Sequence, residues 1–86
     1  MRVLLHKDFT KKYKRLSHSV QQAFKKRRDL FLQNPSHHLL NNHPLRGKYA
    51  GFRSINITGD YRVIYDPLEQ NLAHFITIGT HTELYE

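Results

Sequence analysis

The sequence predicts an α+β domain in which two helices pack on one face of a small, mainly antiparallel sheet. Apolar residues recur with a helical period in the first part of the chain, and they alternate with polar residues between turn sequences after Gly47. The expected order is strand, helix, helix, and then three or four strands. The 86 residues are expected to form a single domain, residues 1–86, with a thin core.

The first strand is expected at residues 3–5 (Val-Leu-Leu). Asp8 can cap the helix that follows, because a carboxylate accepts hydrogen bonds from the free amides of a first helical turn. The apolar stripe of this helix consists of Phe9, Tyr13 and Leu16.

The second helix has two candidate caps, Ser17 and Ser19, and Ser19 with Gln22 matches a capping box. Asn34-Pro35 should end this helix, because the residue before a proline is pushed out of the helical region. The residues expected on its buried side are Val20, Ala23, Phe24, Leu30 and Phe31.

A His-rich polar segment, residues 36–44, is expected to be a loop, and residues 52–57 alternate as a strand does. The turn Thr58-Gly59-Asp60 leads into a returning strand at residues 61–65, which Asp66-Pro67 is expected to close.

The third strand of this meander is expected at residues 72–78, after a turn at residues 69–71. Gly79 is expected to end it and to leave a short tail that contains Thr80, His81 and Tyr85. These strands complete the α+β prediction.

Positive charge is concentrated on the two predicted helices. Fourteen Lys and Arg residues against seven Asp and Glu give a formal net charge of +7, and nine of the fourteen lie between Lys7 and Arg28. This field favours a nucleic acid or an acidic protein as partner over a membrane surface or a merely solvated helical face. The basic residues expected to face that partner are Lys11, Lys12, Lys14, Arg15, Lys25, Lys26, Arg27 and Arg28.

Several classes of protein are disfavoured. The chain has no cysteine for disulfides, no apolar run near the ~18–20 residues that span a bilayer, and too short an apolar start for a signal peptide, so a cytoplasmic location is expected. None of the seven histidines is paired at helical i, i+4 spacing, and the adjacent His37 and His38 would point apart in an extended loop. We therefore expect neither a metal site nor a cofactor.

Three polar residues lie at the ends of predicted elements, where functional groups are commonly displayed. His43 precedes the entry to the sheet, Asp60 lies in the hairpin turn, and His81 follows the last long strand. Taken singly, each could be an ordinary loop, turn or tail residue.

Taken together, four segments resemble the YafQ branch of the RelE/ParE toxin superfamily: His43-Pro44-Leu45-x-Gly47, Gly-Phe-Arg-Ser-Ile-Asn at 51–56, Gly-Asp-Tyr-Arg-Val-Ile-Tyr at 59–65, and Ile-Gly-Thr-His-Thr-Glu-Leu-Tyr at 78–85. The resemblance implies a toxin of a type II toxin–antitoxin system with the RelE-like fold. Such toxins are mRNA interferases that cut messenger RNA on the translating ribosome without a metal ion and are held inactive by a cognate antitoxin. In their reaction the ribose 2′-hydroxyl attacks the adjacent phosphate, which calls for a base, an acid and positive donors.

Motif position assigns roles by resemblance. His43, Asp60 and His81 correspond to catalytic residues, and Tyr85 to an active-site aromatic; which histidine is base and which acid stays open. Arg62 matches an arginine that contacts the scissile phosphate in the broader group. The residues expected to bind RNA are Arg46, Lys48, Arg53, Asn56, Tyr61 and Arg62.

Two departures from the YafQ pattern keep other functions open. Asn56 replaces an active-site histidine and Thr77 an arginine, a charge that Arg62 could supply instead. The alternatives are a ParE-like gyrase poison, whose relatives lack the acid–base residues, and an inactive relative that acts as a binding module. The expected partners are an antitoxin with an acidic or amphipathic C-terminal segment, which could assemble with the toxin as a heterotetramer, and ribosome-bound mRNA.

Overall fold

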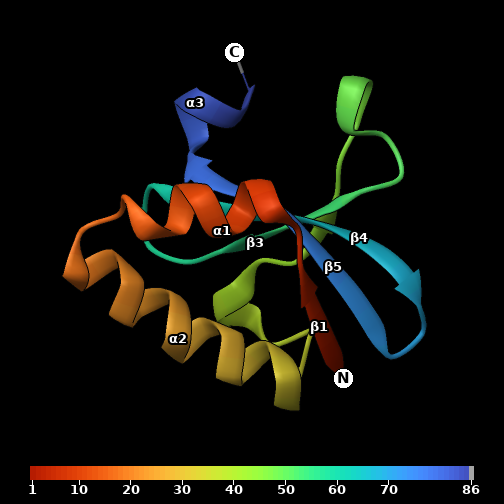
Figure 1. Cartoon of the computed structure of the whole chain (residues 1–86). Coiled ribbons are helices and arrows are strands. Elements are labelled where there is room, and N and C mark those ends of the chain that lie inside the picture. The colour runs from red at the N-terminus through yellow and green to blue at the C-terminus, as the bar shows by residue number, and fades with distance from the viewer. Residues whose placement is uncertain (86) are drawn as a thin grey trace.

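The fold of the chain was obtained as a computed structural model, which describes residues 1–85 (Figure 1). It confirms the α+β class and the strand–helix–helix–sheet order. Its helices and strands, in chain order, are β1 (Arg2–Leu5), α1 (Lys7–Lys14), α2 (His18–Gln33), the 3₁₀ turn η1 (His38–Leu40), β2 (His43–Pro44), the 3₁₀ turn η2 (Gly47–Tyr49), β3 (Arg53–Asn56), β4 (Tyr61–Glu69), β5 (Leu72–Thr80) and α3 (His81–Tyr85).

The strands form one sheet in the order β1-β5-β4-β3-β2. Strands β2 to β5 pair antiparallel, whereas β1 pairs parallel with β5, with Arg2 opposite Leu72. The sheet is therefore mainly antiparallel, as the sequence predicts. Figure 1 shows α1 and α2 on the same side of the sheet and α3 at one end of it.

Phe75 of β5 lies at the centre of the core that the two long helices form with the sheet. Its ring centroid is 5.9 Å from that of Phe9 in α1, and 6.0 and 5.5 Å from those of Phe24 and Phe31 in α2. Tyr65 of β4 lies 6.1 Å away on the sheet side. Phe75 thus joins both helices to the sheet.

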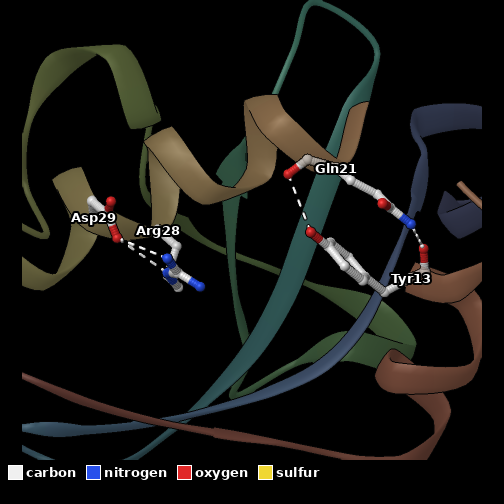
Figure 2. Close-up of polar contacts among 4 residues, drawn as sticks. All are labelled: Tyr13, Gln21, Arg28 and Asp29. Atoms are coloured by element: carbon white, nitrogen blue, oxygen red, sulfur yellow. Dashed lines mark hydrogen bonds and ion pairs between the residues drawn. The ribbon is translucent and has the colours of Figure 1, made fainter. Parts of the chain in front are cut away.

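Two reciprocal hydrogen bonds connect the helices to each other. The Tyr13 hydroxyl donates to the carbonyl oxygen of Gln21 over 3.1 Å, and Gln21 Nε2 donates to the carbonyl oxygen of Tyr13 over 2.9 Å (Figure 2). They hold the two helices together close to the bend between them.

The N-terminal caps of α1 and α2 differ from those predicted from the sequence. Asp8 does not cap α1: His6 precedes the helix, and its Nδ1 accepts a hydrogen bond of 3.0 Å from the Asp8 amide. Ser17 caps α2 through its hydroxyl, which accepts from the Val20 amide, so the capping box predicted from Ser19 and Gln22 is wrong because Ser19 lies inside the helix.

The sheet extends further than the sequence predicts. Strand β4 continues through Asp66-Pro67 to Glu69, because β3 stops pairing with it at Tyr65 and the rest of β4 is a sheet edge, where proline is tolerated. Strand β5 passes Gly79 and ends at Thr80. The predicted loop at 36–44 contains η1 and β2, and the predicted tail is the helix α3. Within residues 1–85, no helix combines the length and hydropathy of a membrane span.

Candidate functional site

A surface pocket of about 380 Å³ brings together side chains from β2, β4, α3 and the loops that flank β2. Successive side chains of a strand point to opposite faces, and Val63 belongs to the core under the helices, so Arg62 points to the other face of the sheet. The pocket is lined by Asn41, His43, Leu45, Arg62, His81 and Tyr85. We call it the histidine pocket.

His43 is held by its own loop. It lies in β2 opposite Ser54 of β3, and its Nδ1 is 2.7 Å from the carbonyl oxygen of Asn41, which has a left-handed backbone (φ 45°, ψ 47°). A carbonyl oxygen can only accept, so Nδ1 carries the hydrogen in this contact. In the neutral imidazole, Nε2 is then the nitrogen with a free lone pair.

His81 and Tyr85 lie one turn apart on α3, with ring centroids 4.7 Å apart. A reciprocal capping box starts this helix: the Thr80 amide donates to Glu83 Oε1 over 2.9 Å, and the Glu83 amide donates to Thr80 Oγ1 over 3.2 Å. The His81 amide also donates to the carbonyl oxygen of Asp60 over 3.0 Å, which joins α3 to the β3–β4 turn. The sequence Thr-His-Thr-Glu at 80–83 is the signal that could have predicted this helix.

Gly79 lies close against α3, where a side chain would have little room. A Cβ on Gly79 would lie 3.3 Å from Cδ2 of Leu84, which is buried under the helix. A side chain at position 79 would therefore require Leu84, which anchors α3 to the sheet, to shift by a few tenths of an ångström.

The capping box lowers the pKa of the Glu83 carboxyl below its usual value of 4.5. The main cause of the lowered pKa is the hydrogen bond from the Thr80 backbone amide, with smaller contributions from the Thr80 side chain and the Lys12 charge, while a slight loss of solvation acts in the opposite direction. Because the unfolded chain takes up this proton before the folded chain does, the contact contributes its full stability above pH 4.5 and loses it as the pH falls through the lowered pKa.

We expect Glu83→Gln to reduce the free energy of unfolding at neutral pH and to flatten its decline in acid. Urea unfolding at a series of pH values would measure both effects. The matched control is Glu69→Gln, which removes an exposed carboxylate at the C-terminal end of β4. Equal pH curves for Glu83→Gln and the wild type would contradict the role of the capping box.

The guanidinium of Arg62 is hydrogen-bonded to backbone carbonyl oxygens of the β3–β4 turn. Nη1 donates to the carbonyl oxygens of Thr58 (3.0 Å) and Tyr61 (3.1 Å), and Nη2 donates to that of Gly59 (3.2 Å). Among residues 1–85, no carboxylate lies within 4.0 Å of this guanidinium. Arg62 therefore brings an unneutralised positive charge to the histidine pocket.

Asp60 and Tyr61 are adjacent to Arg62 in sequence but do not line the histidine pocket. Asp60 is exposed, and its carboxylate bonds to no histidine within the described chain; its carbonyl oxygen is the group that contacts α3. Tyr61 points to the helix side of the sheet and lines a separate pocket with Lys12 and Arg15. The expected contact of Tyr61 with RNA stays a prediction, and it would be made outside the histidine pocket.

Arg53, another residue expected to bind RNA, also lies away from the histidine pocket. Its Nε donates to Asn42 Oδ1 over 2.8 Å, and the Tyr65 hydroxyl donates to the same oxygen over 3.1 Å. Asn42 Nδ2 in turn donates to the carbonyl oxygen of Pro35. Arg53 thus supports the loop that leads into His43.

The two positions that depart from the YafQ pattern have different environments. Asn56 lies opposite Arg62 on β3, and its Oδ1 is buried without a hydrogen-bond partner in the described chain. Thr77 is buried outside the pocket lining, and its hydroxyl accepts a 2.9 Å hydrogen bond from Lys12 Nζ. A positive charge therefore reaches Thr77 from Lys12 of α1. That Arg62 supplies the active-site charge missing at position 77 stays a prediction.

The basic residues of the helices divide into two groups. Arg27 and Arg28 are half-buried: Arg27 Nη1 donates to the Leu39 carbonyl oxygen over 2.6 Å, and Arg28 forms a 3.0 Å ion pair with Asp29 (Figure 2) and lies over the ring of Phe24. The basic residues whose side chains are exposed are Lys7, Lys11, Lys12, Lys14, Arg15, Lys25 and Lys26 on the helices and Arg46 and Lys48 on the β2–β3 loop.

Sequence reasoning missed three residues at or beside the histidine pocket. Asn41 and Leu45 line it, and Tyr49 contacts Tyr85 edge to face. Of these three residues, only Tyr49 had a signal in the sequence, because it is an aromatic residue in a segment flanked by Gly47 and Gly51. No group of three or more His, Asp or Glu side chains within residues 1–85 is placed to hold a metal ion.

Comparisons with known proteins agree with this architecture. The structure is similar to YafQ from E. coli (TM-score 0.76, 24% identity, covering 98% of this chain and 97% of that one) and to the E. coli DinJ–YafQ complex (0.74, 24%, 98% and 97%). It is also similar to the archaeal RelE–RelB complex from Pyrococcus horikoshii OT3 (0.71, 24%, 92% and 92%). A search of curated proteins finds no significant match. The family model described as "Bacterial toxin of type II toxin-antitoxin system, YafQ" matches residues 1–86. The chain therefore belongs to the YafQ family of type II toxin–antitoxin toxins.

Proposed function

We propose that this toxin is an mRNA interferase that inhibits translation by cutting messenger RNA on the ribosome. The observation that supports this most directly is the convergence of two imidazoles, an arginine and a tyrosine on the histidine pocket. Cleavage by the ribose 2′-hydroxyl needs groups that accept and donate protons near neutral pH beside a positive charge, and this set supplies them.

In the proposed reaction His43 is the base. The Asn41 carbonyl oxygen accepts from Nδ1, which leaves Nε2 free to take the proton of the 2′-hydroxyl. The 2′-oxygen then bonds to the adjacent phosphorus while the bond from phosphorus to the 5′-oxygen breaks. His81, protonated at the start, gives its proton to that leaving oxygen. The products are a 2′,3′-cyclic phosphate and a free 5′-hydroxyl.

Arg62 and Tyr85 complete the proposed site. Arg62 would give up one of its carbonyl contacts in the β3–β4 turn to donate to the phosphate, where developing charge makes the hydrogen bond stronger. Tyr85 would stack on a base or donate its phenol proton. Asp60 acts in this proposal through its carbonyl oxygen, which positions α3.

In this proposal the ribosome determines where the messenger RNA is cut. A net charge of +7 favours ribosomal RNA with little sequence preference, so selectivity must come from the unstacked bases that the ribosome presents. This activity places the toxin in the cytoplasm, where translation occurs.

Primer extension on a defined mRNA, with and without translating ribosomes, tests this proposal. We expect cuts only with ribosomes, within the codon in the A site. Cuts on free RNA would support the nuclease activity but contradict its dependence on the ribosome. The absence of cuts in both conditions would overturn the proposal and favour a gyrase-poison or binding role.

We further propose that an antitoxin with an acidic segment covers the exposed lysines of α1 and α2. Relatives solved as complexes, DinJ–YafQ and RelE–RelB, support an antitoxin partner, and the surplus of positive charge supports an acidic one. Co-expression with the product of the adjacent gene should yield a co-purifying complex that Lys11→Glu with Lys14→Glu weakens. Failure of wild-type toxin to co-purify would contradict this partner, and the size of the complex would test the heterotetramer.

A further inference from the structure

Tyr49 of η2 contacts the histidine pocket from outside its lining. Its ring centroid is 6.2 Å from that of Tyr85, and the two rings are nearly perpendicular, at 89°. Figure 1 shows η2 and α3 rising from the same end of the sheet. Since Tyr85 itself lines the pocket, Tyr49 extends its aromatic surface onto the β2–β3 loop.

The loop that carries Tyr49 is internally hydrogen-bonded. The Phe52 amide donates to the Tyr49 carbonyl oxygen over 3.0 Å. The Leu45 amide donates to the Phe52 carbonyl oxygen over 2.9 Å, which joins the two ends of the loop. Gly47 and Gly51 have positive φ angles of 64° and 92°, which other residues rarely adopt. The ring of Tyr49 is thus presented by a turn with a defined conformation, although it is only half-buried.

Positive charge accompanies this ring. Lys48 Nζ lies 5.2 Å from the centroid of the Tyr49 ring, and the side chain of Arg46 is exposed on the same loop. An aromatic ring with an adjacent cation is the combination that proteins use for single-stranded nucleic acids, because the ring stacks on a base and the cation attracts the phosphate.

We infer that Tyr49, together with Tyr85 and Lys48, forms a second base-binding subsite, which takes the base of a nucleotide next to the cleaved bond. The ligand class is single-stranded RNA, with stacking on Tyr49 and a phosphate contact from Lys48. This inference rests on the proposed nuclease function and adds a residue that would influence which sequences are cut.

Fluorescence offers a direct test because the chain contains no tryptophan. Tyr49→Trp introduces a single indole fluorophore, which a stacked base should quench. The titrant is a short single-stranded RNA made uncleavable by 2′-O-methyl groups, at low salt, with binding followed independently by the anisotropy of labelled RNA. The control is Leu68→Trp, at an exposed position on β4 outside the histidine pocket.

We expect the indole fluorescence of Tyr49→Trp to be quenched in a titration that saturates together with the anisotropy, and that of Leu68→Trp to stay unchanged. Bound RNA without quenching at position 49 would overturn the subsite. A wild-type chain that neither binds nor cuts RNA would instead overturn the proposed function, and this inference with it.

Cleavage on ribosomes provides the second readout. Tyr49→Leu should cut about tenfold more slowly, as expected for the loss of one stacked base, and at an altered set of sites. Tyr49→Phe and Tyr49→Trp should keep the wild-type pattern, because both retain a ring. If the wild type cuts and Tyr49→Leu cuts the same sites at the same rate, the subsite is wrong.

Discussion

Replacing His81 with alanine is expected to slow mRNA cleavage by about 10²–10⁴-fold, the usual loss when a general acid or base is removed. The side chain is exposed at the first turn of α3, so its removal leaves no cavity. Its backbone amide, which bonds to Asp60, is retained in the variant. The effect should therefore fall on the chemistry and leave the fold and the antitoxin complex intact.

Single-turnover cleavage on programmed ribosomes, growth after induction, and co-purification with the antitoxin would measure these three properties separately. His18→Ala is the matched control, because it removes another exposed histidine at the start of α2. Unchanged toxicity of His81→Ala would remove His81 from the proposed mechanism. A loss of antitoxin binding as well would point to misfolding.

Phe75→Ala should have the largest effect on stability, a loss of about 3–5 kcal/mol in the free energy of unfolding. The ring is fully buried and contacts aromatic rings from α1, α2 and β4, so its removal leaves a cavity that three elements would have to close together. In a domain of this size, whose total stability is modest, such a loss should leave much of the chain unfolded.

Urea unfolding followed by circular dichroism would measure this loss. Phe75→Leu keeps most of the volume and should cost far less, typically below about 1.5 kcal/mol for a volume-conserving change. If the alanine and leucine variants were equally stable, the central position of Phe75 in the core would be contradicted.

The fold could be predicted where the pattern of apolar residues determines burial. The stripe that contains Phe9 and the one that contains Phe24 and Phe31 predicted both long helices. Alternation within residues 52–57 predicted β3, and the turn Thr58-Gly59-Asp60 predicted the returning strand β4. Prediction failed where a tertiary contact decides the outcome. Pro67 is accepted in β4 only because β3 has already ended, which no local pattern reveals.

The candidate site was predicted in part, for a similar reason. His43, Arg62, His81 and Tyr85 line one pocket, although their catalytic roles stay predictions. Tyr61 was assigned to RNA binding together with Arg62, its neighbour in the same motif. Adjacent strand residues face opposite sides of a sheet, however, so a contiguous motif can supply two different surfaces.

The pairing of β1 with β5 has a consequence for the order of folding. Arg2 lies opposite Leu72, so this parallel pair joins segments from nearly opposite ends of the described chain, whereas β3, β4 and β5 are connected by short turns. Non-local pairing carries the largest loop-closure cost and slows folding. We therefore expect the β3–β5 meander to form early and β1 to dock late. Val3→Ala should then mainly accelerate unfolding, as stopped-flow measurements of both rates would show, whereas a matching loss in the folding rate would indicate early docking.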